Sequence, residues 1–491
     1  MIYTNMSKPP VKRKELIKII SVYTLMTLAV VTIVTFVFFF VLGFRFNVDD
    51  GKIEQYSFLQ FDTSPIGATV TVDGALVSSK TPNKSTVREG RHTVVMTRDG
   101  YQAWTKTVNT KAGTITWLSY ALLIPSKINV SSVVNYNAVY SSLASLKGRS
   151  MLVQERADLP IFDLADLTLD KVKSTQFTVP NSIYSQAGVT GVKHTFAMIS
   201  WDDGGRYVLI KHTYGDKDEW LVLDTQDVNL TKNITRLLNI SVSSVYFSGT
   251  SGNDFYALNL GDIRKLDLSA GTMSKPLVSN VNSFSVYNSN IITYIGTDLL
   301  GSGKQIAGLY REGDSSLHVL RTATSVDSVL HIATAHYYDD NYIVISEGKS
   351  AYIIKGNYPN TVAENTNSMK PYATLSSDQD IQSVSFSPTA GQYVLIQSGT
   401  TYASYDLETK IFTSSITDGN VNLIKWIDKS NLWSDQDGKL TIREFDGQNS
   451  HIVNSVVSGQ SVTLTDNGRY LYSISKSNTG FQLQRVLMIV N

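Results

Sequence analysis

The sequence lacks cysteine entirely, and only 17% of its 491 residues are charged. The absence of cysteine excludes disulfide bonds, thiolate-bound zinc or iron–sulfur clusters, a cysteine nucleophile and a lipid-modified N-terminal cysteine. It does not identify the redox compartment, because a cysteine-free chain is compatible with either side of a membrane. Basic and acidic residues nearly balance, 43 against 42. This balance argues against a general nucleic-acid-binding protein, which usually carries a concentrated basic patch.

Hydrophobic residues make up 42% of the chain, which is enough for large cores and indicates a folded protein. At roughly 150 residues per domain, the length predicts about three folded units. The first informative segment runs from Ile19 to Phe44, 26 residues without a charge. A bilayer core needs roughly 20 helical residues, so this segment predicts a transmembrane helix. A buried helix of a soluble core is the alternative, but such helices rarely run this long without a charge.

The residues flanking this segment predict its orientation. Residues 1–18 carry five basic residues and one acidic residue, whereas the rest of the chain carries 38 basic and 41 acidic residues. The positive-inside rule therefore makes residues 1–18 a cytoplasmic tail and places everything after Phe44 outside the cytoplasm. A cleaved signal peptide is the alternative, but its apolar region is shorter and ends in small residues, unlike Val41–Phe44. We expect an uncleaved signal anchor in a single-pass protein of the cell membrane.

A small β-domain is expected after the anchor. Residues 45–57 form a short juxtamembrane linker with a turn signal at Asp49–Lys52. Polar and apolar residues then alternate over several short segments between 58 and 124, as half-buried strands require. This pattern predicts a compact β-sandwich. Its turn residues stand in a fixed order: Pro65, Gly67 and Ala68, then Asp73-Gly74, Thr81-Pro82, Gly90 and Gly100-Tyr101.

This ordered set closely resembles the PEGA domain, a small extracytoplasmic β-module of prokaryotic proteins. Ile66 stands where the glutamate of the family name would be, so the match is not complete. The resemblance implies an envelope or surface module, often an adaptor or a carbohydrate-interaction domain, without catalysis. The matching residues are of turn-forming types, because proline fixes φ and glycine permits left-handed geometry. We therefore interpret them as structural rather than ligand-binding.

Residues 126–491 read as one long all-β region. Short apolar runs alternate with Gly, Asn, Asp and Ser turns, and no convincing amphipathic helix occurs. Such a region must manage its sheet edges, which favours a series of sandwiches, a barrel or a propeller. A phrase made of an apolar residue, a polar turn with glycine, a tyrosine and an apolar strand occurs three times, at Ser200–Val208, Ser385–Val394 and Thr463–Leu471.

This phrase resembles the first hairpin of WD40-like and TolB-like propeller blades. Several later strands end in an Asp turn, as at Asp224 and Asp406. Repeat units start near residues 137, 195, 243, 283, 332, 382, 421 and 461, a spacing that predicts a β-propeller of seven or eight blades. Ile128–Val134 could close the ring by pairing with Phe481–Val490. No repeat carries the Gly-His and Trp-Asp hallmarks, so a standard WD40 protein is not expected.

Each candidate chemical motif fails at a required position. Ser200-x-Asp202-x-Gly204 begins like a sialidase Asp box, but Arg206-Tyr207 follows it. Asp435-x-Asp437-Gly438 lacks the first calcium ligand and lies between strands. The glycine-rich segment at 301–304 lacks the first glycine and the final Ser/Thr of a phosphate loop. The segment at 249–253 lacks the last glycine of a nucleophile elbow. None of the seven histidines lies in a metal-binding motif, and a metal site assembled from distant blades is the one alternative left open. We therefore predict no catalytic, cofactor-binding or metal-binding residues and no cofactor.

Two classes of function remain open. The first is a membrane-anchored extracytoplasmic binding or scaffold protein. Its propeller would offer a rigid surface to which envelope glycans or proteins bind. The alternative is an exported propeller enzyme acting on glycans or peptides, which would need a channel mouth lined by carboxylates together with an Arg or a Tyr. We favour the binding protein without enzymatic activity, because aromatic residues next to turns would serve as anchors. These residues are Trp201, Tyr214, Trp220, Tyr337, Tyr338, Tyr372 and Trp433.

Overall fold

The computed structural model describes residues 13–47, 51–186, 191–298, 301–314, 317–358, 368–416 and 421–490. The chain divides into two compact units on either side of the Leu123–Ile124 bond. The first unit contains one long helix and a small β-domain, and the second contains the remaining strands. Each unit is described by itself.

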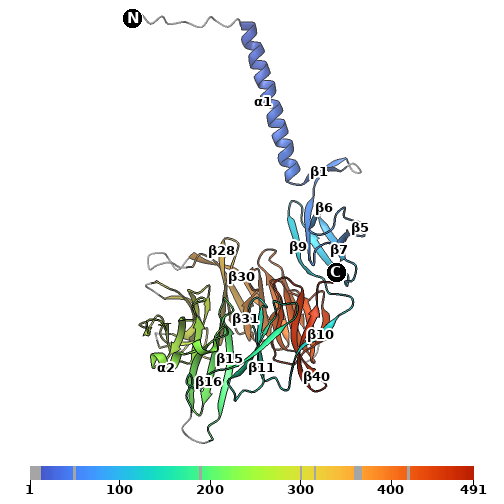
Figure 1. The fold of residues 1–491 in the computed structure, drawn as a ribbon. Coiled ribbons are helices and arrows are strands. Elements are labelled where there is room, and N and C mark those ends of the chain that lie inside the picture. Colours follow the sequence, from blue (N-terminus) through green and yellow to red (C-terminus); the bar gives the residue numbers. More distant parts are fainter. Residues whose placement is uncertain are drawn as a thin grey trace, which may run out of the picture. The chain divides into compact units, whose positions relative to one another are not determined.

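Helix α1 (Arg13–Val41) is a single uninterrupted helix of 29 residues (Figure 1). None of its side chains is buried, and its most apolar 18-residue window has a mean hydropathy of 2.5. At 1.5 Å per residue it is about 43 Å long, more than the roughly 30 Å of a bilayer core. It is therefore long and apolar enough to cross a membrane.

The bounds of this helix differ from those of the predicted span at both ends. The helix begins at Arg13, within the basic segment expected to be a tail, and residues 1–12 of that tail lie outside the described residues. It ends at Val41 rather than Phe44, because Gly43 adopts a left-handed φ of +84° and Phe44 opens a strand. The basic residues therefore extend the helix beyond its apolar segment.

The expected linker 45–57, with its turn signal, contains a short hairpin. Strand β1 (Phe44–Asn47) pairs antiparallel with β2 (Lys52–Gln55), and Asp49 and Asp50 of the predicted turn lie outside the described residues. Two side chains of this hairpin donate to carbonyls at the end of α1: Arg45 Nη1 to Phe40 O at 2.9 Å and Gln55 Nε2 to Leu42 O at 3.0 Å. They satisfy acceptors that a helix end leaves open.

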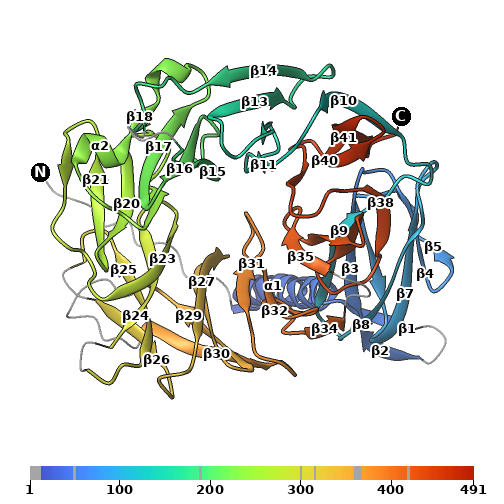
Figure 2. The ribbon, with the colours of Figure 1, turned by 90° about the horizontal axis from the view of Figure 1, so that it is seen from below.

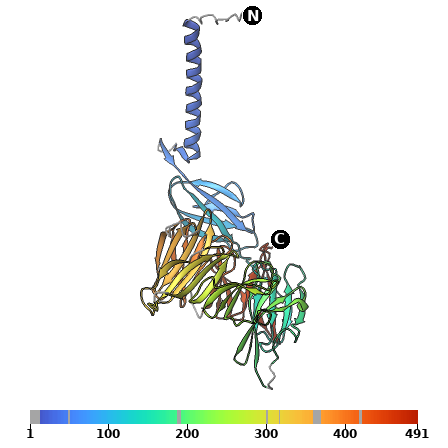
Figure 3. The same ribbon diagram turned by 90° about the vertical axis from the view of Figure 1, so that its left-hand side faces the viewer.

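The small domain consists of two packed sheets (Figure 3). One has the order β6–β3–β9, with β3 and β9 parallel, and the other has the order β5–β4–β7–β8. Their alternating apolar residues meet in a core that includes the fully buried Phe61, Met96 and Trp104. The strands are β3 (Ser57–Ser64), β4 (Thr69–Val72), β5 (Ala75–Leu76), β6 (Asn83–Val87), β7 (Gly90–Thr97), β8 (Trp104–Thr110) and β9 (Ile115–Leu122).

The motif residues of this domain stabilise its turns. The Thr81 hydroxyl accepts the backbone N–H groups of Gly67 (3.1 Å) and Ala68 (2.9 Å) and bonds to Thr63 Oγ1 at 2.7 Å. Asp73 occupies the left-handed region and accepts the N–H of Thr93 at 2.8 Å. These contacts account for the spacing of the motif without a ligand.

Residues after Leu123 form eight four-stranded antiparallel sheets within the described part of the chain. Figure 2 shows them arranged as blades around a ring, with first strands such as β15, β23 and β27 toward the centre and last strands such as β14, β26 and β30 at the periphery. The second unit is therefore an eight-bladed β-propeller. Its predicted blade starts fall within a few residues of the observed first strands.

The first four blades span residues 141–322. Alternating residues of each sheet face the neighbouring blades and form the cores between them, as Phe196 and Trp220 do. The strands are β11 (Ser141–Ala144), β12 (Ser150–Gln154), β13 (Ile161–Asp166), β14 (Lys173–Thr178); β15 (His194–Trp201), β16 (Tyr207–Tyr214), β17 (Lys217–Asp224), β18 (Lys232–Asn233); β19 (Ser244–Phe247), β20 (Asp254–Asn259), β21 (Asp262–Asp267), β22 (Thr272–Met273); β23 (Val281–Tyr287), β24 (Ile291–Thr297), β25 (Gln305–Arg311) and β26 (His318–Thr322). The second blade also carries the short helices η1 (Val228–Leu230) and α2 (Ile234–Leu238) around β18.

The last four blades complete the ring. The remaining strands are β27 (Leu330–Tyr337), β28 (Asp340–Glu347), β29 (Ser350–Gly356), β30 (Met369–Ser376); β31 (Ser383–Phe386), β32 (Tyr393–Ser398), β33 (Thr401–Asp406), β34 (Phe412–Ile416); β35 (Val421–Trp426), β36 (Asn431–Gln436), β37 (Lys439–Glu444), β38 (His451–Ser455); β39 (Val462–Leu464), β40 (Tyr470–Ser477) and β41 (Gly480–Leu487).

The eighth blade is closed by a strand from the start of the propeller. Strand β10 (Val130–Tyr136) pairs antiparallel with β41, so this sheet has the order β10–β41–β40–β39. The register joins Val130 to Val486 and Tyr136 to Phe481. The predicted closing strand and its partner are confirmed, with the pairing about two residues later along the first segment.

The repeated sequence pattern places a side chain that caps the first turn of a blade. Asp202 accepts the backbone N–H of Tyr207 at 2.7 Å, and Ser387 accepts that of Tyr393 at 3.2 Å. Thr465 accepts the equivalent N–H of Tyr470 at 3.1 Å. Each repeat thus places an oxygen-bearing side chain where the first strand turns into the second. A shared backbone requirement explains the phrase.

Three of the predicted aromatic anchors are buried instead of exposed. Trp201, Trp220 and Trp433 expose 7% or less of their surface. Trp201 Nε1 donates to Leu143 O and Trp220 Nε1 to Val242 O, both at 3.1 Å. These indoles fill the space between blades, where a large apolar ring gains most from burial. By contrast, Tyr338 is 69% exposed.

Candidate functional site

Three connections of the propeller meet at one edge of the fifth blade. Neighbouring strands of an antiparallel sheet run in opposite directions. The start of β27, the end of β28 and the end of β30 therefore lie at the same end of the blade, on one face of the propeller. The segment between β26 and β27, the turn between β28 and β29, and the segment between β30 and β31 therefore emerge together. They enclose a pocket of about 490 Å³.

We call this cavity the loop pocket. Its lining combines two carboxylates, two hydroxyls, an amide and an imidazole with two aliphatic side chains. Asp327 and Asp380 form no hydrogen bond or ion pair with other described residues and are exposed to the cavity. The lining residues are Ser325, Asp327, Ser328, Val329, His331, Gly348, Asp380, Ile381 and Gln382.

A buried carboxylate holds the first loop of the pocket. Glu347, at the end of β28, accepts the backbone N–H and the hydroxyl of Thr324, both at 2.6 Å. Its other oxygen accepts the Arg321 guanidinium from β26. Burial raises the pKa of Glu347, but the bonds from Thr324 and Arg321 outweigh it and lower that pKa to about 2. The carboxylate is therefore ionised at neutral pH, and the loop is fixed at its base.

The second loop is held by backbone bonds to the β28–β29 turn. Ser377 N donates to Lys349 O and Ile381 N donates to Gly348 O, both at 2.8 Å. Gln382 Oε1 accepts the N–H of Gly399 at 3.2 Å, which leaves its amide N–H groups as donors. The loop pocket is thus built before any ligand arrives, a property that reduces the entropic cost of binding.

His331 connects the two loops. It follows the first residue of the innermost strand β27, and its ring bonds to the backbone of Ile381. Burial lowers the pKa of His331, more than the bond to Ile381 raises it. The imidazole is therefore mainly neutral at pH 7, and the two aspartates give the pocket a negative charge.

The sequence motifs that resemble an Asp box, a calcium loop and a phosphate loop lie in turns and connections of the structure. Asp202 is 1% exposed, and its oxygens accept the N–H groups of Gly204 (3.0 Å), Arg206 and Tyr207. Asp435 accepts the N–H of Gly438 at 3.1 Å in the β36–β37 turn. The glycines at 301 and 303 lie between β24 and β25. None of these residues lies in the loop pocket.

A cluster of two histidines and a glutamate in the second blade was not predicted. His194 Nδ1 lies 2.9 Å from His212 Nε2, and His212 Nδ1 lies 3.2 Å from Glu219 Oε2. Ser185 donates its N–H (2.9 Å) and its hydroxyl (2.5 Å) to the same carboxylate. The three side chains come from β15, β16 and β17, so only the strand register could have revealed the cluster.

Hydrogen bonding decides the charge of this cluster. Burial raises the pKa of Glu219, but bonds from His212, Ser185 and Asn233 lower it to about 2. Burial lowers the pKa of His194, and the neighbouring His212 lowers it further. Among the described residues, no group of three or more His, Asp or Glu side chains has the geometry to hold a metal ion. The side chains of Ser185, Glu219, His212 and His194 form one hydrogen-bonded chain.

Comparison with known families identifies the small domain. The PEGA domain family matches residues 57–124, which covers β3 to β9. These residues form a PEGA domain in the first unit of the chain. No significant match exists among the curated proteins.

Comparison with solved structures returns propellers at low identity. The propeller domain of Cps50 (Swd1) from Myceliophthora thermophila is 11% identical, covers 67% of this chain and all of its own, and has a TM-score of 0.40. The tricorn protease is 14% identical over 74% of this chain and 38% of its own, with a TM-score of 0.40. Oligogalacturonate lyase from Vibrio parahaemolyticus is 10% identical over 62% and 95%, with a TM-score of 0.36. At such low sequence identity no activity can be transferred, and the fold assignment rests on the ring of eight four-stranded sheets.

Proposed function

We propose that this chain is a membrane-anchored extracytoplasmic binding protein whose propeller takes up an envelope glycan in the loop pocket. The main support is that Asp327 and Asp380 line the same preformed cavity of about 490 Å³. Neither carboxylate has a hydrogen-bond or ion-pair partner among the described residues. This volume falls within the range of small-molecule sites, about 300–1,000 Å³.

The lining suits a hydroxyl-rich ligand. Carboxylate oxygens accept hydrogen bonds from sugar hydroxyls, and the hydroxyls of Ser325 and Ser328 can donate or accept. Val329, which is 55% exposed, offers apolar surface for the C–H faces of a ring, whereas Ile381 is largely buried beneath the pocket. None of the described residues that line the loop pocket is a lysine or an arginine, so a neutral or amino-bearing glycan fits it better than an acidic one.

The first unit supports the proposed location. Helix α1 has the length and hydropathy of a membrane anchor, and a PEGA domain follows it. The excess of basic residues before Ile19 favours a cytoplasmic N-terminus, with both folded units on the other side of the membrane.

A glycan array probed with the purified full-length chain in detergent tests the proposal. We expect saturable binding that drops at least about tenfold in the double variant D327N/D380N, because amides accept more weakly than carboxylates. The matched control is Asp339→Asn, an exposed carboxylate in the β27–β28 turn at the opposite edge of the same sheet. Equal binding by D339N and D327N/D380N would refute the loop pocket as the site, and capture of a protein without any glycan signal would point to a protein partner.

The two carboxylates also favour a second candidate, a glycosidase acting on the same ligand. A catalytic acid, however, needs a carboxyl group shielded from water so that it keeps its proton, and both aspartates are exposed. We therefore propose binding without turnover. Release of reducing ends that disappears in the D327N or D380N single variant would establish the enzyme instead.

A further inference from the structure

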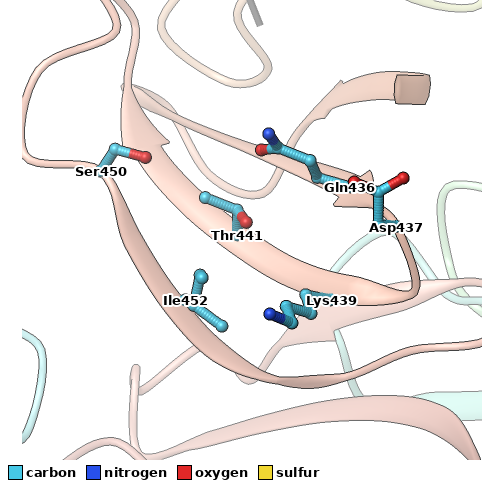
Figure 4. A pocket seen from close by; sticks show the side chains of 6 residues that line it. All are labelled: Gln436, Asp437, Lys439, Thr441, Ser450 and Ile452. Atoms are coloured by element: carbon cyan, nitrogen blue, oxygen red, sulfur yellow. The ribbon is translucent and has the colours of Figure 1, made fainter. Parts of the chain in front are cut away.

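A second cavity lies on the outer part of the seventh blade, away from the loop pocket. It has a volume of about 290 Å³, and Figure 4 shows the side chains that line it. Register pairs Gln436 with Lys439 and Thr441 with Ile452, so its floor is one face of three neighbouring strands, β36, β37 and β38. We call it the strand pocket; its lining residues are Gln436, Asp437, Lys439, Thr441, Ser450 and Ile452.

A buried arginine lies on the same face of β37. Arg443 follows Thr441 by two residues, so both side chains lie on one side of the sheet. Arg443 is only 6% exposed, and its Nη2 donates to Ser434 Oγ (3.0 Å) and Gln436 Oε1 (3.3 Å). Its Nε is buried without a hydrogen-bond partner, and no carboxylate among the described residues forms an ion pair with it. A buried cation with neutral partners alone is unfavourable, so this charge favours an anion nearby.

Thr441 carries a second unsatisfied group next to the cavity. The residue is 3% exposed, and its hydroxyl is buried without a hydrogen-bond partner although the residue lines the pocket. A β-bulge between β37 and β38 interrupts the register next to it, and such bulges redirect side chains. A native structure rarely leaves a buried hydroxyl unpaired without a reason such as an absent ligand.

The other polar groups of the strand pocket are mostly donors. The Gln436 carbonyl oxygen accepts Arg443, so its amide N–H groups are left for the cavity. Lys439 is exposed and forms no ion pair with a described residue, and in Figure 4 its ammonium points toward Ile452 and Thr441. The one acidic lining residue, Asp437, lies at the opposite end from Ser450 in that view.

We propose that the strand pocket binds an oxyanion, either the carboxylate of an acidic sugar or a phosphate group. Lys439, Thr441 and the Gln436 amide contact the anion directly. Arg443 acts from behind them as a positioning residue, because it orients Gln436 and contributes a fixed positive charge. Cations and aligned donors of this kind are the usual partners of carboxylate and phosphate oxygens. The strand pocket thus takes an anionic ligand, unlike the neutral or amino-bearing glycan expected in the loop pocket.

Titration of the purified full-length chain in detergent tests this assignment. Sodium phosphate and sodium glucuronate are titrated separately at constant ionic strength set with chloride, and binding is followed by calorimetry. We expect saturable binding of one of the two anions, and the anion that binds identifies phosphate or sugar carboxylate as the source. The absence of saturable binding with both anions would overturn the proposal.

Two variants locate the site. Thr441→Val keeps the side-chain shape and removes only the unpaired hydroxyl, so the protein should fold normally while anion affinity falls about tenfold. Lys439→Gln should lower the affinity similarly, whereas Lys425→Gln, which removes an exposed lysine on β35 of the same blade, should not. Equal losses in K439Q and K425Q would mean general charge attraction and would overturn the site, as would unchanged binding in T441V.

Discussion

The imidazole of His212 is fully buried in the second blade and depends on the Glu219 carboxylate for one of its two hydrogen bonds. Glu219 in turn accepts two donors from Ser185. A carboxyl group whose pKa is lower in the folded than in the unfolded chain stabilises the fold above its unfolded pKa. That stabilisation is lost as pH falls toward the folded pKa. For Glu219 the loss extends from its ordinary value of 4.5 down to about 2.

His194 adds an effect of the same sign at higher pH. Its pKa is lowered in the folded protein, so the unfolded chain takes up a proton first as pH falls below 6.5. We expect the free energy of unfolding of the full-length chain to decrease from pH 6.5 downward and further below 4.5. Denaturant titrations at a series of pH values measure this decrease.

Glu219→Gln should remove the lower part of this dependence and destabilise the protein at pH 7. The difference between a pKa of 4.5 and about 2 corresponds to about 3 kcal/mol, which sets the scale of the loss. Asp216→Asn, in the exposed turn of the same hairpin, is the control and should change little. A pH profile of E219Q that overlays the wild type below pH 4.5 would contradict the assignment.

The repeated cap at Asp202 makes a second prediction for a single residue. Its carboxylate accepts three backbone N–H groups in a turn that is almost fully buried. Asp202→Ala should therefore lower the free energy of unfolding by about 2 kcal/mol, because buried donors lose their acceptor. Asp203→Ala changes the exposed neighbour and should stay within about 0.5 kcal/mol of wild type. Similar losses in both variants would argue against the cap.

Among the elements, strand β10 closes the ring of the propeller by pairing with β41. Tyr136 at its end is 5% exposed and packs with Met151 of the first blade and Tyr472 of the eighth. Tyr136→Ala should destabilise the propeller by about 3 kcal/mol, the usual cost of removing a buried aromatic side chain. Tyr140→Ala is the matched control, since that ring is 53% exposed. Thermal unfolding of both variants measures the difference, and equal melting temperatures would mean that β10 contributes little.

The sequence carried more information about elements than about sites. Blade starts could be predicted because each blade repeats a local pattern, such as the turn around Asp202 and the Asp turn at Asp224. In the linker after the helix only a turn signal was predicted, and not the strands on either side of it, because each strand has only four residues. The loop pocket could not be predicted, since Asp327 and Asp380 meet only through strand order and loop geometry. The burial of Trp201 was missed because a tryptophan beside a turn can point to either side.

For the whole molecule, the proposed orientation makes a direct prediction. With the N-terminus of α1 in the cytoplasm, protease added outside the cytoplasmic membrane should remove nearly everything after Phe44. The measurement is immunoblotting of an N-terminal and a C-terminal tag on intact cells, or on spheroplasts where an outer membrane is present. The C-terminal tag should disappear while a short N-terminal fragment persists. Protection of the C-terminal tag until the cytoplasmic membrane is opened would reverse the orientation.

The strand that closes the propeller also follows directly the connection from the first unit, because β10 begins at Val130, shortly after Leu123. If the chain is anchored and binds a ligand as proposed, any tension between the anchor and the blades enters the ring through β10. The six register pairs of β10 with β41 carry that tension. If they separate, the ring opens. For the proposed membrane-anchored binding protein, the mechanical strength of this one short ladder would set the load that it bears while a ligand stays bound.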